Sequence, residues 1–216
     1  LTFEVSGKHS YLDPLEVVCY DVPQKGRIQI VKLDQENGKQ LGEGYTFEVS
    51  VAKEVVNADG EIRTMQVDGK ETALTEGTLV AKIQTDENGV AQSPELYLGD
   101  YVVTETAAAE HYAVSGQEYP VSLTYDAQVE TVTAKLQVED VKTSVDILKV
   151  DAEEDIPLAG IHFRMFTSKE LDEAGGTVDQ LDKEVLQSLG TEYITDENGR
   201  IHIGDLTHDT VYYIFE

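Results

Sequence analysis

The sequence predicts an all-β protein built from tandem β-sandwich domains. Apolar and polar residues alternate with a period of two in many short segments, which places every second side chain on one face of a strand. β-Branched residues and tyrosines are common in these segments, as they are in strands. Asn-Gly and Asp-Gly pairs separate the segments, as in Glu36-Asn37-Gly38, and these residues tolerate the positive φ angles of hairpin turns.

The composition excludes several classes of partner. The chain has 216 residues, of which 40% are hydrophobic, enough to form packed cores. Its 42 Asp and Glu outnumber its 16 Lys and Arg, and the formal net charge of −26 repels nucleic acid and anionic membranes. The apolar runs are too short to span a bilayer, so no membrane insertion is expected. Cys19 is the single cysteine, which rules out an intrachain disulfide.

An internal repeat divides the chain. The sequence Thr-Asp-Glu-Asn-Gly occurs at 85–89 and again at 195–199, and a tyrosine-rich segment that ends in Glu follows each copy. Two further segments upstream also occur twice, at 28–34 and 145–151, and at 41–47 and 158–163. Ordered matches at similar spacing indicate repeated structural units. We therefore expect residues 1–24 to be the last strands of one domain, residues 25–142 a complete domain, and residues 143–216 the first part of a further domain.

A short helix is expected within the last unit. Thr177 can cap a helix whose third residue is Gln180, which is the pattern of a capping box, and Gly190 is suited to end the helix. One face of this helix is apolar and consists of Val178, Leu181, Val185 and Leu189. We expect the helix to pack on its own sandwich, with binding of a partner as the alternative.

The strand pattern places three charged side chains in phase with apolar ones. Lys32 follows Ile28 and Ile30, Glu105 follows Tyr101 and Val103, and Asp140 follows Ala134, Leu136 and Val138. Lys149, Glu216 and Asp21 obey the same rule in their own segments. If the apolar faces point inward, each sandwich buries one lysine and two carboxyl groups. The opposite face, which carries Val31 and Leu33 beside Lys32, is the alternative for burial.

Burial of three ionisable groups has a chemical consequence. Each buried ion costs several kcal/mol unless it is paired or neutralised. Desolvation lowers the pKa of an amine and raises the pKa of a carboxyl group, so a neutral amine can come to lie beside a protonated acid. An amide can then form with loss of water, while a second carboxyl group carries protons. The alternative is a buried salt-bridge triad without a covalent bond.

The order of these residues resembles a known family. A lysine in the first strand, a tyrosine-rich strand ending in Glu and an Asp in the last strand are similar to the CnaB-type (SpaA-type, prealbumin-like) domains of Gram-positive adhesins and pilins. The resemblance implies Ig-like β-sandwiches and a spontaneous isopeptide bond between Lys32 and Asp140, assisted by Glu105. It also implies that Lys149 and Glu216 are the reacting lysine and assisting glutamate of the next domain, and that Asp21 is the acceptor of the previous one.

Two features depart from the family pattern. The family usually has a Pro and a Gly shortly after the Glu, whereas residues 106–112 contain neither. The last strand of the family more often ends in Asn, so Asp140 and Asp21 are the rarer acceptor. The first departure concerns the local geometry around Glu105 and leaves the expected fold intact.

The sequence contains no motif for turnover catalysis, a cofactor or a metal. His202 and His208 lie near Asp205 and Asp209, but without tight ligand spacing, so solvated polar residues are expected there. The two Asp-Glu-Asn-Gly segments lack the alternating ligands of a calcium loop, so they are expected to be plain turns.

Two functions fit these observations. The first is a structural stalk or pilin segment of a Gram-positive cell surface, with neighbouring repeats as its partners. The second is a module that binds a host protein or glycan through a sandwich face or through residues 52–82. Aromatic residues make up only 7% of the chain and Trp is absent, which favours the stalk. A spacer within a larger extracellular enzyme would have the same sequence pattern.

The two ends are expected to be completed from outside this sequence. No signal peptide or sorting motif is present. Residues 143–216 provide Lys149 and Glu216 without an acceptor strand, whereas residues 1–24 provide an acceptor strand without a lysine. Flanking sequence of a longer array is the favoured completion. The alternative is a head-to-tail contact between successive chains, which would build a filament.

Overall fold

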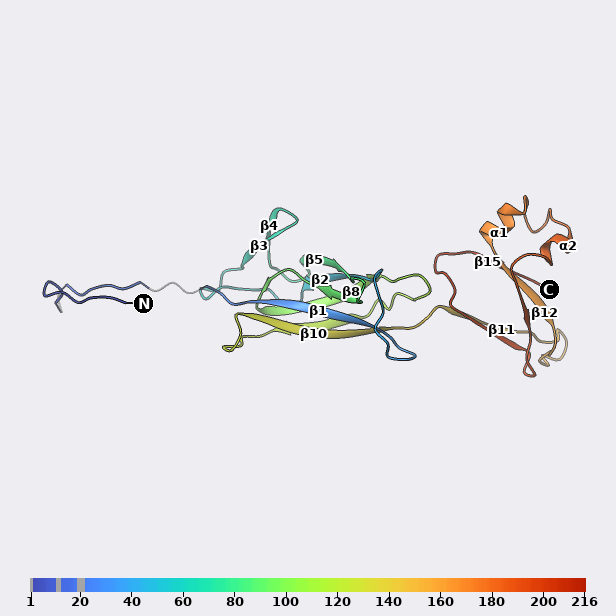
Figure 1. The fold of residues 1–216 in the computed structure, drawn as a ribbon, viewed down its shortest axis with the longest axis horizontal. Helices are drawn as coiled ribbons and strands as arrows, with labels where there is room; N and C mark the ends of the chain where they lie inside the picture. The colour runs from blue at the N-terminus through green and yellow to red at the C-terminus, as the bar shows by residue number, and fades with distance from the viewer. Residues whose placement is uncertain (1, 11–12, 19–21) are drawn as a thin grey trace.

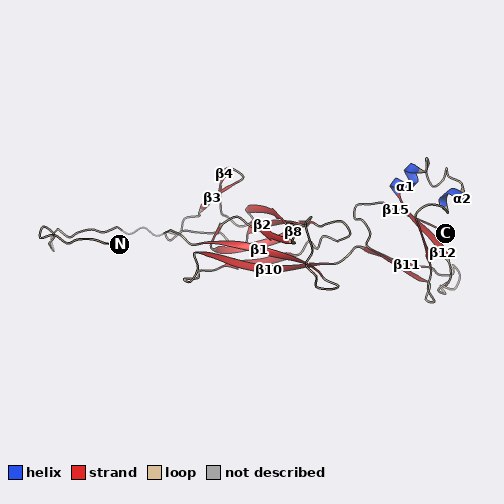
Figure 2. Ribbon diagram, in the orientation of Figure 1, coloured by secondary structure: helices blue, strands red, loops and turns tan. Residues whose placement is uncertain are grey.

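The computed structural model describes residues 2–10, 13–18 and 22–216. Figure 1 shows three parts in a row: an extended N-terminal segment, a β-sandwich and a smaller β-unit that carries helices. Figure 2 shows that strands dominate and that helix occurs only in the last part. The predicted all-β fold class is thereby confirmed. Residues 25–142 are called the first module below, and residues 143–216 the second module.

The sandwich of the first module consists of two four-stranded sheets. One contains β10 (Thr131–Asp140), β1 (Lys25–Asp34), β6 (Val90–Gln92) and β7 (Leu96–Tyr97), and β1 pairs with the other three. The other has the order β5 (Leu79–Gln84), β2 (Thr46–Val51), β8 (Gly99–Ala107) and β9 (Glu118–Leu123). β1 and β10 are the first and last strands of the module and pair in parallel. The main core lies between the two sheets.

Strand β1 shows why the sheets pack in this way. Buried and partly buried residues alternate along its whole length, as expected for a strand in a sandwich. Ile28, Ile30 and Lys32 belong to the buried set, while Val31 and Leu33 are only partly buried. The face that carries Lys32 therefore points into the core, and the opposite face does not.

A hairpin projects from the first module. β3 (Thr64–Val67) and β4 (Lys70–Ala73) pair only with each other among the described residues, and they extend away from the sandwich in Figure 1. Asp68 and Gly69 connect them with φ angles of 49° and 76°, as an Asp-Gly turn allows.

The second module repeats the strand pairings of the first. β11 (Ser144–Leu148) pairs with β14 (Arg200–Gly204), as β1 pairs with β6. β12 (His162–Thr167) lies between β13 (Thr191–Ile194) and β15 (Tyr212–Phe215), as β2 lies between β5 and β8. Main-chain hydrogen bonds repeat too: the N–H of Lys32 donates to the Gly89 carbonyl, and that of Lys149 to the Gly199 carbonyl. The sequence repeat is thus also a repeat of backbone structure.

The helices differ from the prediction. The second module contains two short helices, α1 (Ser168–Glu173) and α2 (Lys183–Leu186), instead of one helix that begins after Thr177. The complete capping box is at Thr167 and Glu170, before α1. Gly175 has a φ angle of 89°, and a helix cannot continue through that backbone conformation.

The predicted apolar face of the helix is only partly correct. The buried residue of α2 is Leu186, whereas Val185 is exposed. Leu186 packs with Phe166 and Leu171, and Val178, Leu181 and Leu189 contact the same cluster. The helices therefore cover the outer face of the β13-β12-β15 sheet, as Figure 1 shows.

The N-terminal segment lies outside both sandwiches. Its described residues form no named strand, and Ser10 and Asp13 make an isolated antiparallel bridge. Gln24 fixes its junction with the first module, because its side chain donates to the carbonyls of Asp126 and Val129 and accepts from the Asp126 N–H. Among the described helices, none has the length and apolar character needed to cross a membrane.

Candidate cross-linking site

Three strands from two sheets bring Lys32, Glu105 and Asp140 together. Lys32 comes from β1, Asp140 from the end of β10 and Glu105 from β8 in the facing sheet. The Nζ atom of Lys32 lies 2.5 Å from Oε1 of Glu105 and 2.5 Å from Oδ1 of Asp140. All three side chains have an exposed fraction of 0%. The three residues that share the phase of apolar neighbours in the sequence therefore point inward, and the lysine contacts both carboxyl groups inside the core.

The two contacts of the lysine are not equivalent. The contact with Glu105 has the angles of a hydrogen bond, in which the amine donates. The contact with Asp140 does not, and both carboxyl oxygens of Asp140 are buried without a hydrogen-bond partner among the described residues. The ion pair with Lys32 offsets only part of the cost of burying the Asp140 carboxylate, because burial outweighs it in the pKa of this group.

The environment favours the protonated form of Asp140. The pKa of this carboxyl group is raised from 3.8 to about 6, chiefly by burial and also by the negative charge of Glu105, while contact with Lys32 opposes the increase. A carboxyl group of this kind retains its proton at a pH where ordinary aspartates are ionised. The protonated acid is the electrophile that amide formation requires.

Aromatic rings close the site on one side. The ring centroid of Tyr45 lies 5.0 Å from Nζ of Lys32, and that of Phe47 lies 5.6 Å from it. Both residues have an exposed fraction of 1% or less. The rings attract a cationic amine and keep water away from a neutral one.

A loop between β8 and β9 holds Glu105 from the other side. The N–H of Ser115 donates to Oε2 of Glu105 over 3.1 Å. Residues 106–112 lack the Pro and Gly of the family pattern. The loop that they begin nevertheless brings the Ser115 N–H into contact with Glu105. One oxygen of Glu105 faces Ser115 and the other faces Lys32.

Sequence reasoning missed Tyr45, Phe47 and Ser115 as parts of the site. Phe47 could have been found, because it occupies the position of Phe163 in the repeat. Tyr45 gives no such signal: its backbone pairs with Thr85 as that of Ile161 pairs with Thr195, so the repeat places a different residue type there. Ser115 contacts Glu105 through its main-chain N–H, and the type of residue at that position gives no indication of such a contact.

The second module brings together the predicted pair Lys149 and Glu216. Nζ of Lys149 lies 2.7 Å from Oε2 of Glu216, which is the only carboxylate among the described residues at ion-pair distance from this lysine. The side chains are 28% and 51% exposed, unlike the sealed pair of the first module. The third predicted residue, Asp21, lies outside the described residues.

The remaining polar motifs have structural partners. Asp86 and Asp196 each accept hydrogen bonds from the N–H groups two and four residues further along their turns. These backbone hydrogen bonds, chiefly from Val90 and Arg200, lower the pKa of each aspartate. His202 pairs with Asp146 and His208 with Asp209. In the part of the chain that the structure describes, no three His, Cys, Asp or Glu are grouped so as to hold a metal ion.

Comparison with known proteins identifies the family. The SpaA prealbumin-like fold domain matches residues 26–137 and, separately, residues 143–216. The chain belongs to the SpaA family of prealbumin-like domains. The two matches correspond to the two β-units of the structure. No curated protein matches the chain.

Solved structures similar to this chain include pilins and one further bacterial protein. The TIE protein of Bacillus anthracis is 21% identical with a TM-score of 0.44, and the match covers 89% of this chain and 29% of that protein. A streptococcal ancillary pilin is 22% identical with a TM-score of 0.39, covering 99% and 59%. The shaft pilin SpaA of Lactobacillus rhamnosus GG is 15% identical with a TM-score of 0.36, covering 88% and 86%. The chain thus spans less than two thirds of the first two proteins.

Proposed function

We propose that this chain is a structural stalk or pilin-like segment of a Gram-positive cell-surface protein, and that an isopeptide bond between Lys32 and Asp140 locks its first module. The contact of a buried amine with two buried carboxyl groups, each 2.5 Å from Nζ, carries this proposal. Membership of the SpaA family supports the structural role. The strongly acidic surface suits a module that remains soluble and unassociated along its length.

The reaction balances without a cofactor. The neutral amine of Lys32 attacks the side-chain carbonyl carbon of protonated Asp140, and a carbon–nitrogen bond forms. Glu105 takes a proton from the nitrogen and delivers it to the departing hydroxyl group, which leaves as water. The reacting groups are fixed in contact by three strands, so little entropy is lost on the way to the transition state. The product is a neutral amide, and the buried ionisable groups of Lys32 and Asp140 are both removed.

We extend the proposal to the second module. Lys149 and Glu216 are the amine and the assisting acid of a second cross-link, whose acceptor comes from a strand beyond the described residues. The exposure of this pair is the state expected before such a strand covers it. Asp21 is the corresponding acceptor for a preceding repeat. Neighbouring repeats of the same surface protein are therefore the partners of both ends.

Binding of a host ligand is less well supported. The exposed aromatic residues among those described include Phe3 in the N-terminal segment and Tyr125 in the loop between β9 and β10, and they do not form a common patch. The projecting β3–β4 hairpin presents mainly polar side chains. We therefore assign the structural role to this segment.

Intact-mass spectrometry of the full chain tests the bond. The wild-type protein should be one water molecule lighter than its sequence, whereas Glu105→Gln, which keeps the shape of the side chain, should have the full mass. Glu105→Ala should also have the full mass. Loss of the cross-link should lower the free energy of unfolding by about 2–5 kcal/mol, by analogy with disulfides that close long loops. A folded wild-type protein with the full mass would refute the bond.

A further inference from the structure

The loop formed by residues 108–115 touches the cross-linking site with one side and the second module with the other. On the inner side, the N–H of Ser115 donates to Glu105. On the outer side, the carbonyl of His111 accepts hydrogen bonds from the N–H and the hydroxyl of Thr143, at the start of the second module. Ala108 is buried, and Ala109 and Tyr112 pack against the core of the first module. This one short segment therefore contacts both the second module and the reacting groups of the first module.

Tyr112 is the inner anchor of this loop. Its hydroxyl donates to Oδ2 of Asp34 over 3.0 Å, and its ring meets the ring of Tyr45 edge-on, with centroids 6.0 Å apart. Tyr45 in turn faces the amine of Lys32. Tyr112 therefore supports, through one intervening ring, the aromatic wall that encloses the lysine.

Asp34 is suited to hold Tyr112 in place. Its side chain is almost fully buried, at the end of β1 and two residues beyond Lys32. Burial raises the pKa of Asp34, but hydrogen bonds from the Glu36 N–H, the Tyr112 hydroxyl and the Asn37 amide outweigh it, so the pKa is lowered. An ionised acceptor makes a strong hydrogen bond with a tyrosine hydroxyl.

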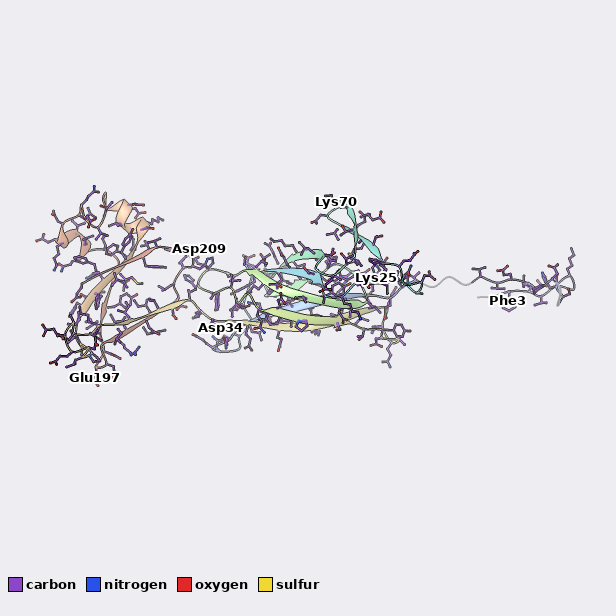
Figure 3. All side chains as sticks on the ribbon, turned by 180° about the vertical axis from the view of Figure 1, so that it is seen from behind. Phe3, Lys25, Asp34, Lys70, Glu197 and Asp209 are labelled. Atoms are coloured by element: carbon purple, nitrogen blue, oxygen red, sulfur yellow. The ribbon has the colours of Figure 1, made fainter. Side chains whose placement is uncertain are left out.

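The second module docks on the outer side of the same loop. The hydroxyl of Thr207 donates to Oε1 of Glu110 over 3.1 Å, and Asp205 forms an ion pair of 2.9 Å with Lys142. The Leu206 N–H donates to the Thr143 carbonyl. Figure 3 shows Asp34 and Asp209 at the facing ends of the two modules, with Glu197 at the far end of the second module.

The backbone of the loop requires this support. His111 has a φ angle of 72°, a conformation that non-glycine residues rarely adopt because of steric strain. The hydrogen bonds from Thr143 to the His111 carbonyl, and the hydrogen bond from Thr207 to the adjacent Glu110, hold that conformation from outside. Without them, the strained residue can relax, and the loop can move away from Glu105 and Tyr45.

From these contacts we infer that docking of the second module onto loop 108–115 positions the Lys32–Glu105–Asp140 site, so that cross-linking of the first module is faster when the second module has folded against it. Tyr112 and the Ser115 N–H are the positioning groups, because they touch Tyr45 and Glu105 and not the forming bond. This inference rests on the proposed isopeptide bond.

The test follows the rate of water loss in the full chain. The chain is synthesised in a brief cell-free pulse, aliquots are quenched in acid over time, and the cross-linked fraction is read by intact mass. The outer contact is removed by Asp205→Asn with Thr207→Val. The matched control is Asp209→Asn, which lies in the same loop and whose side chain is 95% exposed. The inner contact is removed by Tyr112→Ala, and Tyr112→Phe keeps the ring that packs on Tyr45.

The expected cross-linking rates differ among variants in a way that differences in folding stability alone do not produce. The Asp205/Thr207 double variant should cross-link about two- to fivefold more slowly than wild type, because exposed polar contacts contribute only modest energies. The Asp209→Asn control should cross-link at the wild-type rate. Tyr112→Ala should be slower by about tenfold or more, and Tyr112→Phe should recover most of the rate. Chemical denaturation of each variant shows whether the protein is fully folded under the conditions in which its cross-linking rate is measured.

The outcomes separate the two proposals. If wild type never loses water while folded, the isopeptide bond itself is refuted, and the inference with it. If wild type loses water but the double variant does so at an equal rate while folded, the bond stands and the coupling is wrong. If Tyr112→Phe is as slow as Tyr112→Ala, the ring is not the positioning element and the inference is likewise overturned.

Discussion

At the residue scale, a sealed group of charges defines the first module. Lys32, Glu105 and Asp140 are fully enclosed, and removal of one member of such a group leaves the others unpaired. Such a loss costs about 3–5 kcal/mol in buried ion pairs. An amide between Lys32 and Asp140 removes two of the three ionisable groups at once. The arrangement therefore keeps three ionisable groups paired in the core and places two of them in position to form a covalent bond.

The raised pKa of Asp140 predicts an unusual dependence of stability on pH in a protein that cannot cross-link. In Lys32→Met the amine is absent, so its opposing effect on Asp140 is lost and the pKa stays at about 6 or rises above it. The folded state then binds one more proton than the unfolded state at pH values between 3.8 and the folded pKa. Stability due to this group is present below that window and is lost as the pH rises through it.

The expected size of this loss is about 3 kcal/mol, since each unit of pKa shift corresponds to about 1.4 kcal/mol. Chemical denaturation from pH 4 to pH 8 measures it, with Lys32→Met/Asp140→Asn as the control, because the control lacks the titrating group but keeps the other carboxylates. Parallel stability curves for the two variants would contradict the role of burial at Asp140.

At the scale of elements, strand phase and turn geometry locate the reacting groups. Lys32 is aligned with Val138 in the parallel pairing of β1 and β10, and Asp140 lies two residues further along. The lysine must therefore reach diagonally across to the neighbouring strand, which its long side chain allows. The repeated Asp-Glu-Asn-Gly turn lies directly beside this point, because its Gly89 carbonyl accepts the Lys32 N–H.

Gly89 is predicted to be essential to this packing, and Gly38 provides a matched comparison. Both have a φ angle of 67°, so alanine is strained to a similar extent at either site. A Cβ atom at Gly38 meets open space, whereas at Gly89 it collides with the main-chain carbonyl of Leu41. Gly89→Ala should therefore destabilise the protein by about 1–3 kcal/mol more than Gly38→Ala.

Urea denaturation of the two alanine variants, both made in the Glu105→Gln background so that the cross-link does not mask the effect, measures the difference. Equal losses for both variants would show that the turn moves freely away from Leu41. The same turn in the second module brings Gly199 close to Lys149 and Leu158, which indicates that the close approach belongs to the repeat.

The helices illustrate the limit of local patterns. Residues around Thr177 contain part of a capping box, and Gln180 does accept a hydrogen bond from the Thr177 N–H. The helix nevertheless begins later, at Lys183, while the full capping box forms at Thr167. The deciding factor is burial of Leu171 and Leu186 against Phe166 on the outer face of the sheet, which overrides the weaker local preference.

At the scale of the whole molecule, the position of the bond determines how tension passes through the chain. The modules lie in a row, and tension applied to the ends enters the first module at Lys25 and leaves it after Asp140. Lys32 and Asp140 are near the carboxyl ends of parallel β1 and β10. A bond between them carries the load directly, so the intervening chain bears none.

Single-molecule force spectroscopy is expected to reveal this path. The first module of the wild-type chain should release almost no length under load, because only short segments lie outside the bond. In Glu105→Gln it should unfold and release roughly 350–400 Å, from the extended length of the residues between Lys32 and Asp140. Release of that length by the wild-type chain, in protein that carries the cross-link by mass, would contradict the load path.

Strand periodicity and the repeat were sufficient to establish the all-β class, the repeated units and the shared phase of Lys32, Glu105 and Asp140, because these depend on residues close in sequence. Tertiary structure alone decided that this phase points inward, since both faces of β1 carry apolar residues. It also decided the contacts of 2.5 Å, because β1, β8 and β10 are brought together by pairings between residues far apart in sequence. The wall of Tyr45 and Tyr112, the role of loop 108–115 and the division of the helix likewise arise from packing, which no local pattern encodes.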